Sequence, residues 1–144
     1  LCNEWEDRMA GVEMRVQLRG IGCELHHGPS GAVIHTVPPK DNGGDGSSFS
    51  PTDLLGASLA SCALTTMALL AAKEGLTFGD ASATVVKHMV GPPRRVGELT
   101  VELRMPKGVP SGQRARLEEI AHGCPVAKSL HPDVKVPMTF VWPD

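Results

Sequence analysis

The chain has 144 residues, a formal net charge of −2 and 41% hydrophobic residues, and its length fits one folded domain. Three Phe, two Trp and no Tyr, together with a charge near zero, supply few groups that stack on bases or neutralise phosphates. We therefore expect no nucleic-acid partner.

The N-terminal segment is polar and charged, unlike a secretory signal, so we expect a cytoplasmic location. Residues 1–11 are expected to form a flexible tail and residues 12–144 a single domain. No pair of cysteines or histidines has zinc-finger spacing, so we expect no metal site. Structural disulfides are uncommon in the cytoplasm, which leaves four free thiols to consider, Cys2, Cys23, Cys62 and Cys124.

Apolar and polar residues alternate over residues 13–25 around Gly20, which predicts a β-hairpin with one solvent-facing side. Cys23 falls on the apolar side, where we expect a packed core thiol. Residues 32–37 predict a third strand. Residues 41–48, DNGGDGSS, predict a flexible linker, because they lack the ordered acidic spacing of a calcium-binding loop.

A long uncharged stretch follows, with no charged residue between Asp53 and Lys73. Residues 50–76 predict a central helix, and Gly75 supplies its stop. Apolar side chains occur nearly all round this helix, so we expect protein to enclose it on most faces and to bury Cys62 in its middle. The stretch is long enough to cross a bilayer, but its Ser and Thr residues and the lack of flanking Trp or Tyr favour a helix inside a domain, without a membrane partner.

Three more strands are predicted, at residues 81–90, 98–105 and 134–142, and the first two of them are antiparallel. The element order is N-terminal antiparallel strands, long central helix, two further strands, short helices and a C-terminal strand. This is an α+β pattern without the regular βαβ alternation of a doubly wound sheet. An apolar helix in so small a fold needs more cover, which a homodimer would supply.

Two short helices are predicted before the last strand. The first opens at Ser111 and carries its apolar residues on one stripe, Leu117, Ile120 and Ala121. The second begins at Pro125 and places Cys124 at or next to its N-cap, where backbone N–H groups and the helix dipole would lower the pKa of the thiol. His122 and His131 are close in sequence and could act as a base, so a cysteine hydrolase or transferase is one alternative function.

Two of the cysteines stand in longer motifs, SPTDLLGASLASC at residues 50–62 and GCPV at residues 123–126. Together the motifs resemble the OsmC/Ohr family of thiol-dependent peroxidases and their OsmC-like relatives, over most of the chain. The resemblance implies an OsmC-like fold and an intertwined homodimer with its sites at the subunit interface. It also implies that Cys62 attacks the peroxide and that Cys124 resolves the sulfenic acid as a disulfide, with an external dithiol as reductant and no metal or organic cofactor.

The chain departs from the family at the pair that activates the thiolate. Family peroxidases carry a glutamate directly after the helix-opening proline, where it orients an arginine, and here Thr52 takes that position. Asp53 is the next carboxylate, about 100° around the helix, and His26 and His27 stand where the arginine is expected. Candidate supporting residues are therefore Thr52, Asp53, His26 and His27, with Arg15, Arg19, Arg94 and Arg95 as other sources of positive charge.

Two functions follow from this pattern. The first is a thiol peroxidase for organic hydroperoxides, whose alkyl tails suit the side chains around Cys62, namely Leu55, Leu59 and Leu69 with Thr65 and Thr66. The alternative is an OsmC-like dimer without peroxidase activity that binds a small lipophilic ligand, with redox-sensing or vestigial thiols. A peroxidase needs a reactive thiolate and a second cysteine close enough to bridge, whereas a binding protein needs neither.

Overall fold

The computed structural model describes residues 9–143. The chain forms two compact units, Leu1–Pro51 and Thr52–Asp144, and each is described by itself. The tail predicted at residues 1–11 lies mostly outside the described residues. The single domain predicted at residues 12–144 stays a prediction.

The first unit contains one antiparallel sheet of three strands in the order β1-β2-β3. Its strands are β1 (Met14–Arg19), β2 (Gly22–His27) and β3 (Val33–Thr36), followed by the short 3-10 helix η1 (Lys40–Asn42). Gly20 turns the first hairpin with a φ of 66°, which the left-handed region allows to glycine at little cost. The predicted hairpin and third strand are therefore confirmed.

One face of this sheet is apolar. Val16 on β1 faces Leu25 on β2, which in turn faces Ile34 on β3. The β1 side chains on this face stay largely exposed in the single chain, with exposed fractions of 66% for Met14, 62% for Val16 and 67% for Leu18. Cys23 lies on the same face, as the sequence predicts, but it is only half-buried in the single chain.

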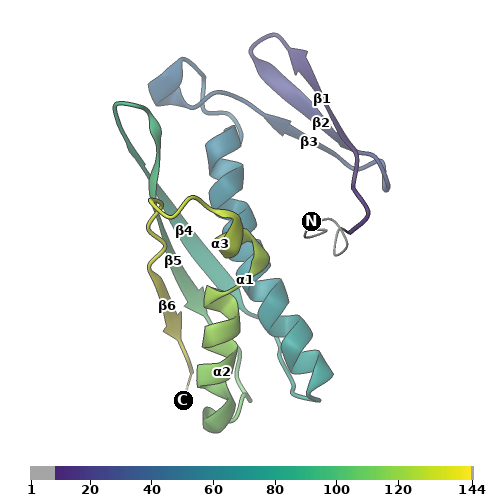
Figure 1. The fold of residues 1–144 in the computed structure, drawn as a ribbon, viewed down its shortest axis with the longest axis vertical. Helices are drawn as coiled ribbons and strands as arrows, with labels where there is room; N and C mark the ends of the chain where they lie inside the picture. The colour runs from purple at the N-terminus through teal and green to yellow at the C-terminus, as the bar shows by residue number, and fades with distance from the viewer. Residues whose placement is uncertain (1–8, 144) are drawn as a thin grey trace, which may run out of the picture. The chain divides into compact units, whose positions relative to one another are not determined.

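The central helix, α1 (Pro51–Lys73), carries the first of the two candidate thiols (Figure 1). It ends as the sequence predicts, because Gly75 takes a φ of 67°. The backbone N–H of Gly75 donates to the carbonyl of Ala72, and that of Leu76 donates to the carbonyl of Ala71. Within the described residues, α1 is the one helix long and apolar enough to cross a membrane, a test that the core helix of a folded domain also passes.

The second unit packs α1 with a three-stranded sheet and two helices (Figure 1). The elements are β4 (Ser82–Val90), β5 (Arg95–Arg104), α2 (Ser111–His122), α3 (Pro125–Ser129) and β6 (Met138–Val141). The strand order is β4-β5-β6, with β4 antiparallel and β6 parallel to the central strand β5. Leu99, Val101 and Leu103 of β5 are fully buried, in one core cluster with the buried residues of α1.

Three features differ from the sequence predictions. The strand β5 begins at Arg95, because it pairs with β4 back to the tight turn between them. The strand β6 is shorter than predicted and starts after Pro137, whose carbonyl still accepts a hydrogen bond from Val101. On α2 only Leu117 and Ala121 are buried, and Ile120 is 36% exposed because it lies beside that i, i+4 stripe.

The single chain fully buries one side of α1 and leaves a stripe of the helix exposed. The buried positions are Gly56, Leu59, Ala60, Ala63, Met67 and Ala71, which form one stripe along the helix. A second stripe is exposed and consists of Ser58, Ser61, Thr65, Leu69 and Ala72. The positions between the two stripes are partly buried, and the expectation that protein covers the helix on most faces, which relied in part on a second chain, stays a prediction.

Candidate thiol site

Cys62 lies in the middle of α1, between the buried and the exposed stripes of the helix. It is half-buried, so the expectation of a fully buried thiol is wrong for the single chain. Its sulfur lies 4.0 Å from the Oγ1 of Thr66, one helical turn further on. The residue as a whole is therefore partly accessible from solvent.

Cys124 is the N-cap residue of α3, with Pro125 in the first turn, as the sequence predicts. The thiol is fully buried in the core of the second unit. Burial raises its pKa above the ordinary value of 9.0, and the neighbouring Cys62 thiol raises it further, while hydrogen bonds from the backbone N–H groups of Ala127 and Val126 act in the opposite direction. The predicted lowering of this pKa is wrong, because loss of solvent outweighs the N–H groups of a five-residue helix.

The fold brings these two thiols into contact, although they are 62 residues apart in the sequence. One comes from α1 and the other from the junction of α2 and α3, and both elements pack on β5. Both cysteines are free thiols in the structure. A half-exposed thiol beside a buried one is an arrangement in which the first can react with a solute and the second can close a disulfide.

Thr52 and Asp53 hold the start of α1 to the sheet through Lys87 of β4. The Lys87 Nζ donates to the Thr52 Oγ1 at 2.8 Å and lies 2.7 Å from the Asp53 Oδ1. The lysine side chain is 15% exposed and that of Asp53 is 38% exposed, so water reaches this ion pair from the carboxylate side. Thr52 lies ten residues before Cys62, about 15 Å along the helix axis, so the first turn positions the helix and does not contact the thiol.

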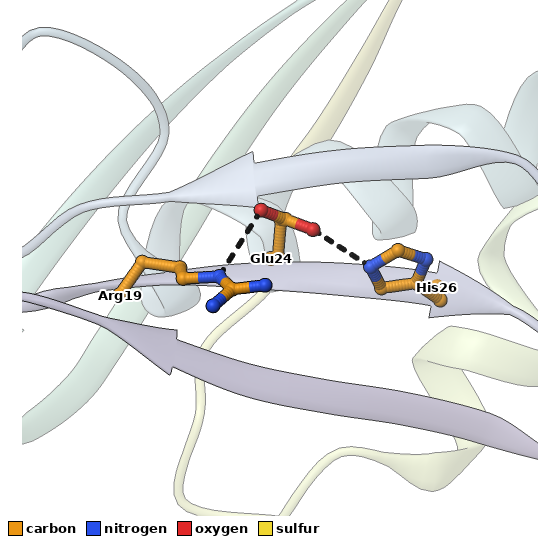
Figure 2. A network of polar contacts seen from close by, with 3 residues as sticks. All are labelled: Arg19, Glu24 and His26. Atoms are coloured by element: carbon orange, nitrogen blue, oxygen red, sulfur yellow. Dashed lines mark hydrogen bonds and ion pairs between the residues drawn. The ribbon is translucent and has the colours of Figure 1, made fainter.

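The two histidines of β2 make polar contacts inside the first unit. The His26 Nε2 lies 2.9 Å from Glu24, whose other oxygen is 3.4 Å from the Arg19 Nε (Figure 2). The hydrogen bond from His26 and the charge of Arg19 lower the pKa of the Glu24 carboxyl. The His27 Nδ1 lies 2.6 Å from the Ser30 hydroxyl.

The other candidate bases and cations also have partners of their own. The His122 ring packs edge-on against Phe140 at 5.4 Å between centroids, and the His131 Nδ1 accepts a hydrogen bond from the backbone N–H of Asp133. Arg15 pairs with Glu13, and Arg95 donates to the carbonyl of Val96.

An open hollow of about 310 Å³ lies where α1 meets the segment that leads to β4. Its lining consists of Leu64, Thr65, Ala68, Phe78, Gly79, Asp80 and Ala81. Of the side chains predicted to hold an alkyl tail, only Thr65 lines it, because Leu59 is fully buried in the core and Leu69 is 65% exposed elsewhere on the helix. Across residues 9–143, no group of three or more His, Cys, Asp or Glu side chains is placed to bind a metal ion.

The sequence analysis missed the roles of two residues, Thr66 beside the Cys62 sulfur and Lys87 at the start of α1. Thr66 was expected to line an alkyl site, and its contact with the sulfur of Cys62 follows from i, i+4 spacing on a helix. No sequence spacing predicts the role of Lys87, because its pairing with the first turn of α1 depends on how that helix crosses β4.

The solved structures that resemble the chain share one fold. A protein of Psychrobacter arcticus described as an osmotic stress induced and detoxification response protein is 34% identical, with a TM-score of 0.85 over 92% of this chain and 98% of that one. An organic hydroperoxide resistance protein OsmC of Legionella pneumophila is 19% identical, with a TM-score of 0.71 over 92% and 98% of the two chains. An organic hydroperoxide resistance protein of Elizabethkingia anophelis is 18% identical, with a TM-score of 0.75 over 95% and 99%.

Among curated proteins, none matches the chain in sequence. The family model described as OsmC-like protein matches residues 44–139, which include the central helix, both thiols and most of the second sheet. The fold of strands, central helix, strands, short helices and closing strand agrees with this match. The chain therefore belongs to the OsmC-like protein family.

Proposed function

We propose that the protein is a thiol-dependent peroxidase that reduces organic hydroperoxides through Cys62 and Cys124. The observation that carries the proposal is the contact between the half-exposed thiol of Cys62 and the buried thiol of Cys124. Membership of a family that includes organic hydroperoxide resistance proteins supports a peroxide-related redox role.

The reaction needs two steps on the protein and one external reductant. The Cys62 thiolate attacks one oxygen of the hydroperoxide, the O–O bond breaks, and the alkoxide leaves as an alcohol after taking up a proton, which leaves a sulfenic acid on Cys62. The Cys124 thiol then condenses with the sulfenic acid, forming the disulfide and releasing water. An external dithiol reduces the disulfide by thiol–disulfide exchange and is itself oxidised.

The different exposure of the two thiols supports this assignment of roles. The attacking sulfur must meet a dissolved peroxide, and Cys62 is the more accessible of the two. The resolving sulfur meets only a protein group, so the buried position of Cys124 does not hinder it. Around Cys62, α1 exposes mostly small side chains, Ser58, Ser61, Thr65 and Ala72 together with Leu69, which leave room for the organic substituent of a hydroperoxide.

The proposal is tested by treating the reduced protein with cumene hydroperoxide and following the free thiols. Each cysteine lies in its own tryptic fragment, with Cys62 in residues 41–73 and Cys124 in residues 117–128, so the expected disulfide links these two fragments. Rapid loss of the Cys62 thiol, followed by formation of this link, is the expected result. Thiols that survive excess peroxide for many minutes would contradict a peroxidase and favour the lipophilic-ligand alternative.

We further propose that the protein acts as a homodimer. In the single chain the apolar face of the first sheet is more than half exposed at Met14, Val16 and Leu18. The central helix also exposes a stripe that includes Leu69 and Thr65. The exposed apolar face of the sheet is costly in water, and a second copy of the chain would cover it together with this stripe of the helix.

Val16→Lys is expected to weaken the dimer by at least about tenfold, because it would bury a charge in the apolar face. Gln17→Lys is the matched control, since Gln17 is the next residue of β1 and faces the opposite side of the sheet, beside Glu24. Light scattering over a dilution series measures the mass of each variant. Equal dissociation of the two variants would show that this face is not the interface.

A further inference from the structure

We infer that Thr66 is a positioning residue that stabilises the Cys62 thiolate through its hydroxyl group. This role rests on the proposed function, in which Cys62 is the attacking thiol. The Thr66 Oγ1 lies 4.0 Å from the Cys62 sulfur and is the hydroxyl that the structure places against it. Both side chains are half-buried on adjacent turns of α1, so the helix holds the two groups in fixed register.

The hydroxyl can change its partner when the thiol ionises. In the reduced protein Thr66 donates to the carbonyl oxygen of Cys62 at 2.6 Å, so its oxygen is available to accept a hydrogen bond from the thiol. When the sulfur loses its proton, the same hydroxyl can rotate and donate to the anion. Hydrogen bonds to ionised acceptors are shorter and stronger than neutral ones, which favours this second arrangement.

The carbonyl that Thr66 would release keeps other donors. Thr65 also donates to the Cys62 carbonyl, at 3.2 Å, and the carbonyl lies within α1, where the backbone N–H four residues on is its regular partner. When the Thr66 hydroxyl rotates, the Cys62 carbonyl oxygen therefore still accepts a hydrogen bond. The change of partner from carbonyl to sulfur costs little free energy for this reason.

The surroundings of Cys62 in the second unit make this hydroxyl important. The titratable group that packs against Cys62 from the α2–α3 junction is the Cys124 thiol, which supplies no positive charge. Lys87 of β4 pairs with Asp53 in the first turn of α1. This ammonium group is therefore about 15 Å from Cys62 along the helix. A neutral hydrogen-bond donor on the same helix is then a direct means of stabilising the thiolate.

Thr66→Val tests the inference, because valine keeps the shape of the side chain and removes only the hydroxyl. The measurement is the rate of iodoacetamide alkylation of fragment 41–73, in which Cys62 is the only cysteine, from pH 5 to pH 10. We expect the midpoint of the curve to move about one pH unit higher, with alkylation near neutral pH about tenfold slower and rates that converge at high pH. Thr66→Ser is expected to restore the wild-type curve.

Thr65→Val is the matched control, since Thr65 bonds the same Cys62 carbonyl but the structure records no contact of its hydroxyl with the sulfur. Equal curves for Thr65→Val and Thr66→Val, or a rate lowered equally at every pH, would overturn the inference. Thr66→Ala serves as a second variant if valine perturbs the fold. Because alkylation uses no peroxide, a shifted curve in a protein that does not react with cumene hydroperoxide would support the role of Thr66 and refute the peroxidase.

Discussion

Cys62→Ser is expected to lose peroxide reduction by about a thousandfold or more, because a serine hydroxyl at neutral pH is a poor nucleophile and cannot be oxidised to a sulfenic acid. The substitution replaces one sulfur atom by oxygen at a partly buried position on α1, so the fold should be preserved. The measurement is consumption of cumene hydroperoxide with an excess of dithiol, beside the wild-type protein. Near-normal turnover in this variant would show that another thiol attacks the peroxide.

Cys124→Ser separates the two steps of the proposed cycle. This variant should consume one equivalent of peroxide and then hold a sulfenic acid on fragment 41–73, which dimedone would trap. Cys23→Ser is the matched control, because Cys23 lies on β2 of the first unit and has no role in the proposed cycle. If Cys23→Ser also blocked disulfide formation, the resolving cysteine would have to be reassigned.

Much of the fold could be predicted from local patterns in the sequence. Alternating apolar residues predicted the first hairpin and the paired strands β4 and β5, since a strand with one buried face must repeat every two residues. Gly75 predicted the end of α1 because few other residues adopt its positive φ. Pro125 predicted the start of α3 and placed Cys124 at its N-cap.

Features that depend on tertiary packing could not be predicted in this way. The burial of Cys124 comes from the packing of α1, β5 and α2 around it, and it reverses the effect expected from helix position alone. The exposure of Cys62 depends on which stripe of an apolar helix meets the sheet, and the uniform composition of α1 does not specify that stripe. The pairing of Lys87 with Asp53 likewise depends on how α1 crosses β4.

The buried Cys124 leads to the second large effect, a steep pH dependence of disulfide formation. Burial raises its pKa above the ordinary value for a cysteine, so this thiol is mostly protonated at pH 7. Because the thiolate is the attacking form, the rate at which Cys124 condenses with the Cys62 sulfenic acid should rise about tenfold for each pH unit from pH 7 to pH 9. The rise should level off only above the raised pKa.

Rapid mixing with one equivalent of cumene hydroperoxide, followed by acid quenching and tryptic mapping, measures both steps in the same samples. Loss of free Cys62 reports the attack on the peroxide, and the link between fragments 41–73 and 117–128 reports the resolution. A resolution rate that is equal at pH 7 and pH 9 would show that burial does not control this thiol. The expected slow resolution would instead leave the half-exposed sulfenic acid of Cys62 open to an external thiol, so that near neutral pH the reductant could act on Cys62 before the disulfide forms.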